Sequence, residues 1–252
     1  MKIIGTIEAR MGSSRLPEKT LKKVYKDFTL LELVVKRFQL SRNIDGIIVA
    51  TTIEKQDDKI ALWCKENNIS CYRGSEDDVL DRVVGASIES KADVIVQMGA
   101  DSAYLDFELI DELISVYRKG NYDYVCNDME LTYPLGIYGH IVNAKKLIEL
   151  NKKDSLSVED REDVVRYIWE HPKEYNILNI KATEDNNYPN LRLTVDYLED
   201  FTLAENIYKH FDRIDFTTKD IIKLYNVNQE LFKDVSELIQ HSAPFIKNDN
   251  DR

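Results

Sequence analysis

Residues 46–51 read Gly-Ile-Ile-Val-Ala-Thr, and residues 93–98 read Asp-Val-Ile-Val-Gln-Met. Both runs are largely apolar and of strand length, which is the pattern of parallel strands buried on both faces. The run 2–7 predicts a first strand, and apolar residues at helical spacing over 29–40 predict a helix after it. This alternation continues over half of the chain and predicts an α/β doubly wound sheet.

The second half of the chain is less regular, and no repeat or linker separates it from the first. We therefore expect one domain, with the second half packed on the first. Further helices are predicted at 57–67, from residue 75 onward, and at 106–119, 158–170, 196–210 and 218–240. Further strands are predicted at 69–72, 122–126, 135–143, 175–180 and 191–195.

The 252-residue chain has a formal net charge of −11 and a pI of about 5.0. A field of that sign does not attract nucleic acid or an anionic membrane, so a polyanionic substrate would need a local basic pocket. No apolar stretch approaches the roughly 20 residues that span a bilayer. The cysteines are Cys64, Cys71 and Cys126. Their odd number and spacing fit neither disulfides nor a metal site, so we expect reduced thiols in a cytoplasmic protein.

The loop after the first predicted strand is the first candidate for a binding site. It contains three cations within ten residues of an otherwise acidic chain, at the edge where α/β folds bind ligands. Two small residues allow tight backbone whose amides can turn toward a ligand. Amides together with Arg and Lys suit a triphosphate; the alternative is a solvated basic loop. The loop reads Ala9-Arg10-Met11-Gly12-Ser13-Ser14-Arg15-Leu16-Pro17-Glu18-Lys19.

Carboxylates follow two other predicted strands. Asp101 comes two small residues after one strand, and Asp196 ends the run Leu-Arg-Leu-Thr-Val-Asp. If a triphosphate binds at the first loop, Asp101 is suited to hold Mg²⁺ and Asp196 could be a second ligand. Alternatively, Asp196 caps the next helix, with Glu199 completing a capping box. Asp106 is a better cap than Asp101 for the helix that follows it.

Three segments, taken in order, resemble one known family. The first is the loop 9–19, which matches the signature Ala-Arg-Met-Gly-Ser-x-Arg-Leu-Pro-x-Lys. The second is the run 73–82, which reads Arg-Gly-Ser-Glu-Asp-Asp-Val-Leu-Asp-Arg. The third is the run 193–201, which reads Leu-Thr-Val-Asp-x-x-Glu-Asp-Phe. Together they resemble the cytidylyltransferases of the spore coat polysaccharide type, relatives of CMP-sugar-acid synthetases.

That resemblance implies a Rossmann-like, mixed and mostly parallel sheet flanked by helices, as in nucleotide-diphospho-sugar transferases. It implies a single nucleotidyltransferase domain over 1–245, followed by a polar tail at 246–252. Because dimers are common among such relatives, a homodimer is expected.

The same resemblance assigns roles to individual residues. Arg15 and Lys19 would contact the triphosphate and act in catalysis, and Asp101 and Asp196 would hold Mg²⁺. An anionic oxygen of the acceptor would attack the α-phosphorus and release pyrophosphate. Arg73 and Gln97 lie where such enzymes read the pyrimidine edge. The expected CTP contacts are Ala9, Arg10, Met11, Gly12, Ser13, Arg73 and Gln97.

The chain departs from the family's pattern in two places. Residues 100–103 read Ala-Asp-Ser-Ala where members have Gly-Asp-x-Pro, and residues 135–140 read Leu-Gly-Ile-Tyr-Gly-His where an acidic stretch is usual. We infer that the acceptor pocket is less negative and suits a small anionic acceptor. Alternatively, the strand predicted at 135–143 only packs differently. The acceptor would be a sugar acid, a sugar phosphate or a phosphorylated amino-acid derivative such as L-glutamine phosphate, because the chain also resembles CTP:phosphoglutamine cytidylyltransferases of capsule biosynthesis.

Five residues are candidates for acceptor contacts, and Glu162 could orient one of them, Arg166, from the same helix face. The candidates are Asn127, Tyr133, His140, Arg166 and Arg192. Two other functions are compatible with these segments. A glycosyltransferase that uses a nucleotide sugar could have the same sheet, although its usual Asp-x-Asp motif is replaced by the lone Asp101. A nucleotide-binding regulatory module would need the phosphate loop but not Asp196.

Overall fold

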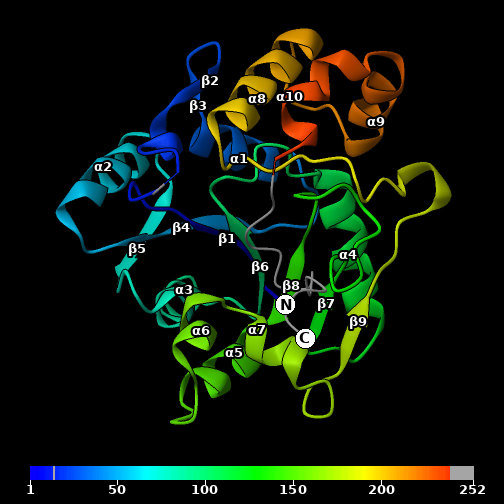
Figure 1. Cartoon of the computed structure of the whole chain (residues 1–252). Coiled ribbons are helices and arrows are strands. Elements are labelled where there is room, and N and C mark those ends of the chain that lie inside the picture. Colours follow the sequence, from blue (N-terminus) through cyan, green and yellow to red (C-terminus); the bar gives the residue numbers. More distant parts are fainter. Residues whose placement is uncertain (14, 239–252) are drawn as a thin grey trace.

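The protein is described by a computed structural model that covers residues 1–13 and 15–238. In this part of the chain the buried runs form one sheet of seven strands, with helices on both faces (Figure 1). From edge to edge the strands are β5 (Ser70–Gly74), β4 (Gly46–Thr52), β1 (Ile3–Glu8), β6 (Val94–Gly99), β8 (His140–Asn143), β7 (Tyr124–Cys126) and β9 (Ile177–Asn179).

Most of the sheet is parallel. β1 pairs in parallel with β4 and with β6, and β4 pairs in parallel with β5. β8 is reversed, since it is antiparallel to both β6 and β7, and β9 is parallel to β7. The carboxyl ends of β1, β4, β5 and β6 therefore share one edge, and the chain enters β8 from that same edge. The predicted mixed, mostly parallel sheet is confirmed.

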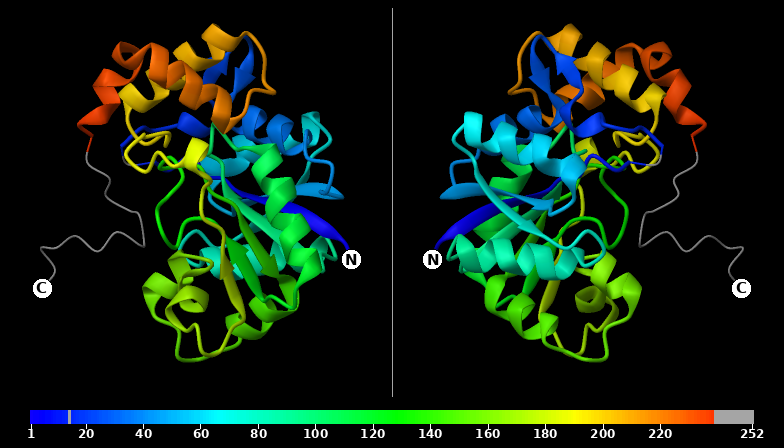
Figure 2. Two further views of the ribbon diagram at one scale, coloured as in Figure 1. Left: turned by 90° about the vertical axis from the view of Figure 1, so that its right-hand side faces the viewer. Right: turned by 90° about the vertical axis from the view of Figure 1, so that its left-hand side faces the viewer.

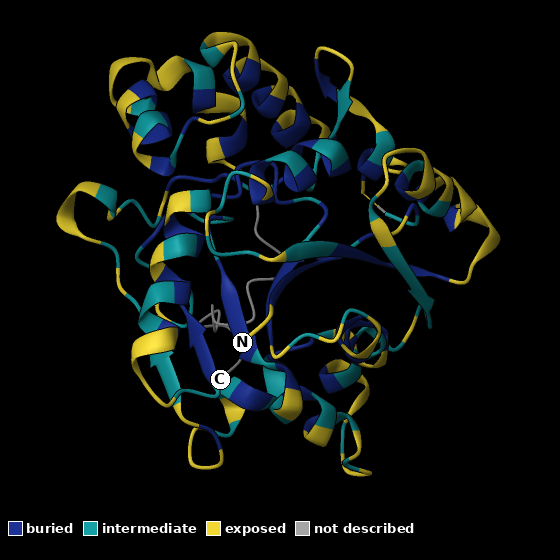
Figure 3. Cartoon of the chain, turned by 180° about the vertical axis from the view of Figure 1, so that it is seen from behind, coloured by how far each residue is buried: buried dark blue, intermediate teal, exposed yellow. Residues whose placement is uncertain are grey.

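Side chains that alternate along each strand supply two hydrophobic cores. In β1, Ile3 and Ile7 face the first core and Ile4 faces the second. The helices of the two cores lie on opposite sides of the sheet (Figure 2), and the strands between them are largely buried (Figure 3). The first core takes residues from α1 (Leu30–Phe38), α2 (Asp58–Glu66), α4 (Phe107–Lys119), α8 (Leu198–Phe211), α9 (Thr218–Val227) and α10 (Lys233–Ser236). The second takes them from α3 (Val79–Glu89), α5 (Ala144–Asn151) and α7 (Arg166–Glu170), and α6 (Val158–Glu162) contacts α3.

The helix predicted at 158–170 is interrupted. It forms the two short helices α6 and α7, because Asp163 Oδ1 accepts a hydrogen bond from the backbone amide of Val165 at 3.1 Å. Such a local turn competes with the helical hydrogen bonds. Val164 and Val165 are buried in the second core at this break.

The strands predicted at 135–143 and 191–195 are also shorter than expected. The regular part of the first is β8, and before it the chain turns at Gly136, whose φ is 97°. The second is reduced to an isolated parallel bridge between Leu135 and Arg192. The amide of Leu193 donates to the carbonyl oxygen of Leu135 at 2.7 Å. Two distant segments are thereby held side by side at the carboxyl edge of the sheet.

Some elements were not predicted, namely α5 and a small hairpin of β2 (Lys23–Tyr25) and β3 (Phe28–Thr29). The helix predicted at 218–240 ends at Val227, where α9 gives way to the 3-10 turn η4 (Gln229–Phe232) and α10. Residues 239–240 and the tail 246–252 lie outside the described residues. No helix of the described chain is both long and apolar enough to cross a membrane.

Gly136 is the turn residue on which this edge depends. A Cβ there would lie 2.5 Å from the carbonyl oxygen of Leu193, in a backbone region that L side chains rarely adopt. We expect Gly136→Ala to lower the free energy of unfolding by about 2 kcal/mol, measured by urea denaturation. Gly46→Ala is the control, because its Cβ would meet only the side chain of Ile4, at 3.3 Å. Equal losses in the two variants would contradict the constraint at Gly136.

Candidate active site

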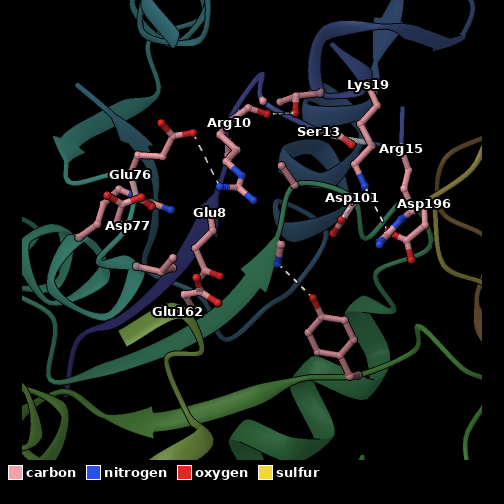
Figure 4. Close-up of a pocket in the computed structure, with 18 residues that line it drawn as sticks. Glu8, Arg10, Ser13, Arg15, Lys19, Glu76, Asp77, Asp101, Glu162 and Asp196 are labelled. Atoms are coloured by element: carbon pink, nitrogen blue, oxygen red, sulfur yellow. Dashed lines mark hydrogen bonds and ion pairs between the residues drawn. The ribbon is translucent and has the colours of Figure 1, made fainter. Parts of the chain in front are cut away.

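A cleft of about 560 Å³ lies at the carboxyl edge of the parallel strands (Figure 4). That volume is in the range of pockets that enclose a small-molecule ligand. Acidic side chains outnumber basic ones in its lining, so the net negative charge of the chain extends into the cleft. The lining residues are Glu8, Ala9, Arg10, Gly12, Ser13, Arg15, Lys19, Thr20, Glu76, Asp77, Val79, Arg82, Gly99, Ala100, Asp101, Tyr138, Glu162 and Asp196.

The loop after β1 is fixed by a buried carboxylate. Asp57 is fully buried, and its Oδ1 accepts a hydrogen bond from the amide of Met11 at 2.7 Å, while Thr52 donates its hydroxyl to Oδ2. The carbonyl oxygen of Met11 in turn accepts from the amides of Ser13 at 2.9 Å and Glu18 at 3.2 Å. The loop therefore closes on itself. Met11 is buried within it and does not line the cleft, in contrast to the predicted contact.

Lys19 joins the two carboxylates that were predicted from separate strand ends. Its side chain is buried, and Nζ lies 2.8 Å from Asp101 Oδ2 and 3.6 Å from Asp196 Oδ1. It also donates to the carbonyl oxygen of Val195 at 2.6 Å. Arg15 completes the group, 2.8 Å from Asp196 Oδ1. We call Arg15, Lys19, Asp101 and Asp196 the clamp.

Asp196 carries its negative charge in this environment. Burial alone would raise the pKa of Asp196, but the hydrogen bond from Arg15 and the charge of Lys19 hold it below its ordinary value. Its carboxylate is not a helix cap, because the N-cap residue of α8 is Tyr197 and Asp200, in the first turn, completes the capping box. Asp200 Oδ2 accepts from the amides of Asp196 at 2.9 Å and Tyr197 at 3.0 Å. Both oxygens of Asp200 also accept from Arg192 at 2.8 Å.

Asp101 is positioned by the segment that departs from the family pattern. The hydroxyl of Tyr138 accepts a hydrogen bond from the amide of Gly99 at 3.1 Å and lies 3.0 Å from Ser102 Oγ. These contacts fix the turn on both sides of Asp101. Burial raises the pKa of Tyr138, so the phenol stays neutral. The two departures, at 100–103 and 135–140, therefore meet at one point in the structure.

The opposite end of the cleft is acidic, as Figure 4 shows for Glu8, Glu76, Asp77 and Glu162. Arg10 lies between this end and the clamp, with Nη1 3.8 Å from Glu76 Oε1.

Glu76 and Asp77 were predicted to lie in the first turn of a helix, but α3 begins only at Val79, with Asp78 as its cap. The amide of Asp78 bonds to Ser75 Oγ, so Glu76 and Asp77 stay in the loop before α3 and face the cleft. Of residues 135–140, Tyr138 lines this cleft. The expectation of a less negative acceptor pocket stays a prediction.

Two predicted base contacts do not line the cleft. The guanidinium of Arg73 lies 2.7 Å from Asp58 and bonds to the carbonyl oxygen of Thr52 at 2.9 Å. Gln97 is buried behind the cleft wall, where its amide nitrogen donates to Glu8. Glu8 itself was missed, although it ends the first strand and the same strand-end pattern had identified Asp101.

None of the five predicted acceptor contacts lines the cleft. Asn127 is fully buried and bonds to the backbone of Ile137 and Gly139. Tyr133 is in the first core, and His140 is buried against Gln97. Arg166 lies 3.2 Å from Glu170, whereas Glu162, predicted to orient it, lines the cleft instead. Arg192 pairs with Asp200.

The fold and the clamp together define a nucleotidyltransferase. The sequence model described as cytidylyltransferase matches residues 4–239, and the chain belongs to that family. It is 37% identical over 231 residues to the uncharacterized protein MJ1063 of Methanocaldococcus jannaschii, covering 92% of this chain and 93% of that protein. It is 34% identical over 235 residues to the spore coat polysaccharide biosynthesis protein SpsF of Bacillus subtilis, covering 90% and 95% respectively.

A solved structure leads to the same family. The cytidylyltransferase of Leptospira borgpetersenii superposes with a TM-score of 0.86 at 27% identity, covering 96% of this chain and all of that one. The resemblance inferred from the three motifs is confirmed, and so is the fold class. The family membership favours a nucleotidyltransferase over the glycosyltransferase and the regulatory module.

A substitution of Asp57 tests whether this buried carboxylate fixes the loop 9–19. In Asp57→Ala both carboxylate oxygens are removed, so the amide of Met11 and the hydroxyl of Thr52 lose their acceptor. We expect about tenfold weaker CTP binding and a loss of about 1–3 kcal/mol in unfolding free energy, measured by calorimetry and urea denaturation. Thr52→Val is the control, because it leaves the bond to Met11 intact. Unchanged CTP affinity in Asp57→Ala would contradict the proposed role.

Proposed function

We propose that the chain is a Mg²⁺-dependent cytidylyltransferase that joins CTP to a small anionic acceptor and releases pyrophosphate. The observation that supports this most directly is the clamp, in which one buried ammonium contacts two carboxylates, one from the turn after β6 and one from the segment before α8. Arg15 adds a second cation at the same end of the cleft. Family membership supports the use of CTP.

The residues of the clamp fit a magnesium ion. Mg²⁺ is often bound by one or two carboxylates, with phosphate oxygens and waters completing its shell. Asp101 and Asp196 lie on the same side of the cleft and already share one cation, Lys19 Nζ. No group of three His, Cys, Asp or Glu side chains in the described residues makes a metal site alone, which agrees with an ion that binds together with the nucleotide. When bound, Mg²⁺ would neutralise and orient phosphate oxygens.

The chain's own residues would supply the remaining charge and position. Lys19 has three hydrogens, of which two point to Asp101 and to the carbonyl oxygen of Val195. The third is available to a phosphate oxygen, as is the half-exposed guanidinium of Arg15. In the reaction an acceptor oxygen bonds to the α-phosphorus, and the bond from that phosphorus to the bridging oxygen of the β-phosphate breaks. Catalysis would rest on in-line positioning and charge neutralisation.

A second cavity of about 170 Å³ supports an acceptor site beside the clamp. It shares Asp101, Tyr138 and Asp196 with the larger cleft, so its occupant would border the triphosphate. Within the described residues, Thr194 lines this cavity and its buried Oγ1 has no hydrogen-bond partner. The volume and the neutral hydroxyl groups favour a small, hydrogen-bonding acceptor whose anionic oxygen reaches toward the clamp. A sugar acid, a sugar phosphate and L-glutamine phosphate are the acceptors to test first.

The biological setting is part of the same proposal. Similarity to a spore coat polysaccharide biosynthesis protein supports a role in surface polysaccharide or capsule synthesis. We further propose that the chain acts in the cytoplasm as a homodimer. The first experiment is a panel of nucleoside triphosphates and these acceptors with Mg²⁺, with pyrophosphate release as the readout. Pyrophosphate release from CTP without any acceptor would contradict the proposal. So would the absence of pyrophosphate release with every acceptor tested.

Lys19→Ala tests the clamp directly. We expect turnover to fall by more than tenfold at saturating Mg²⁺, because the variant loses the buried cation that faces the phosphates. Lys23→Ala is a matched control, since Lys23 is exposed, forms an ion pair with the surface residue Asp27, and does not line the cleft. Circular dichroism would verify that both variants fold. Wild-type turnover in Lys19→Ala would disprove the catalytic role.

A further inference from the structure

Glu8 is a cleft-lining carboxyl group to which the proposed reaction gives no role. It ends β1, the central strand of the parallel part, and it is only partly buried. In Figure 4 it lies below Arg10, next to Glu162 and away from the clamp. The inference drawn from it rests on the proposed function, because it concerns how the same cleft selects its nucleotide.

A chain of buried hydrogen bonds stands behind Glu8. Gln97 Nε2 lies 2.9 Å from both Oε1 and Oε2 of Glu8. Gln97 Oε1 lies 2.6 Å from His140 Nδ1, and His140 Nε2 lies 2.9 Å from Asp128 Oδ2. With the amide of Gln97 in this orientation, its oxygen accepts from His140 and its nitrogen donates to Glu8. The protein therefore presents Glu8 to the cleft as a hydrogen-bond acceptor.

The charges along the cleft determine which part of the nucleotide reaches Glu8. At the clamp two cations balance the two carboxylates, so a Mg²⁺ ion bound there would make this end net positive. The far end has four carboxylates, Glu8, Glu76, Asp77 and Glu162 (Figure 4), against the two cations Arg10 and Arg82, so it stays net negative. Phosphates are repelled by the net negative far end and would be attracted to the clamp with Mg²⁺ bound. The nucleoside, which carries hydroxyl and amine donors, consequently fits the acidic end.

We propose that Glu8 selects the base by accepting a hydrogen bond from the exocyclic amine of cytosine. Uracil has a carbonyl oxygen at the same position, and a carboxylate facing that oxygen is left without a donor and is repelled. Gln97 is then a positioning residue that acts through Glu8. This replaces the direct reading of the pyrimidine edge predicted for Gln97 and Arg73, whose polar groups bond elsewhere.

The proposal has a consequence for pH. Burial raises the pKa of Glu8 to about 7, against the opposing effects of the hydrogen bond from Gln97 and the charge of Arg82. Above that pH Glu8 is a carboxylate and accepts only; below it, the neutral acid can donate to a carbonyl, so discrimination weakens. The charged and titratable groups around Glu8 are Arg82 from α3, His140 from β8 with Asp128 behind it, Asp163 between α6 and α7, Glu162 from α6, Arg10 from the loop, and Tyr138.

The test is isothermal titration of the whole chain with CTP and with UTP in the presence of Mg²⁺. The two nucleotides share sugar and phosphates, so the ratio of their Kd values isolates the base. We expect Glu8→Gln to reduce the preference for CTP by about tenfold, since an amide can donate to uracil as well as accept from cytosine. Glu205→Gln, an exposed position on α8 outside the cleft, is the control and should keep the wild-type ratio.

A measurement on the unmodified chain guards against a misfolded variant. The preference for CTP should be larger at about pH 8 than at about pH 6 in the wild type, and independent of pH in Glu8→Gln. A purely structural role for Glu8 would weaken both nucleotides equally and leave the ratio unchanged, which would overturn the inference. If neither nucleotide binds the wild type, the proposed function itself fails, and this inference fails with it. Binding of CTP with an unaltered ratio in Glu8→Gln overturns the inference alone.

Discussion

The ammonium of Lys19 is the point at which three parts of the chain meet. A buried cation is costly unless it is paired and hydrogen-bonded, so the loop after β1, the turn after β6 and the segment before α8 must come together around it. Each of these parts is held by its own buried support. The supports are Asp57 under the loop, Tyr138 behind the turn, and the pair of Arg192 and Asp200 beneath Asp196. Each part of the clamp therefore rests on a hydrogen-bonded support, which is the preorganisation that the proposed electrostatic role would require.

Much of the fold could be predicted because it depends on local patterns. Buried parallel strands are continuous apolar runs, so β4 and β6 were evident at 46–51 and 93–98, and Asp106 was recognised as a helix cap. Prediction failed where tertiary contacts outweighed the pattern. The run 191–195 looks like a strand, yet its only sheet-like contact is a bridge to Leu135, whose position depends on the turn at Gly136. A single residue at positive φ leaves little trace in hydrophobic periodicity.

The same distinction between local pattern and tertiary contact holds for the site residues. Asp101 and Asp196 could be predicted because a carboxylate after a buried strand lies at the edge where such folds bind ligands. The acceptor contacts could not, because sequence gives a residue's element but not its partners. Asn127 supports the backbone of a neighbouring segment, and Arg73 is turned toward Asp58. Glu8 ends the first strand and fits the same pattern, so it could have been predicted as well. Its buried partners Gln97 and His140 could not, because they come from other strands.

The reversed direction of β8 affects how this scaffold can change. In a wholly parallel sheet the cleft wall would be made of segments that leave strands, and each would continue into a covering helix. Here one wall segment, 133–139, instead leads into a strand, and it is attached to the rest by a backbone bridge at Leu135. Its exchange would leave the phosphate loop and its buried supports in place, apart from the contact made by Tyr138. The fold thus separates the loop 9–19 and its support Asp57 from a neighbouring segment that can be exchanged. Under the proposed function, a change of acceptor would then require a change in that segment and not in the clamp.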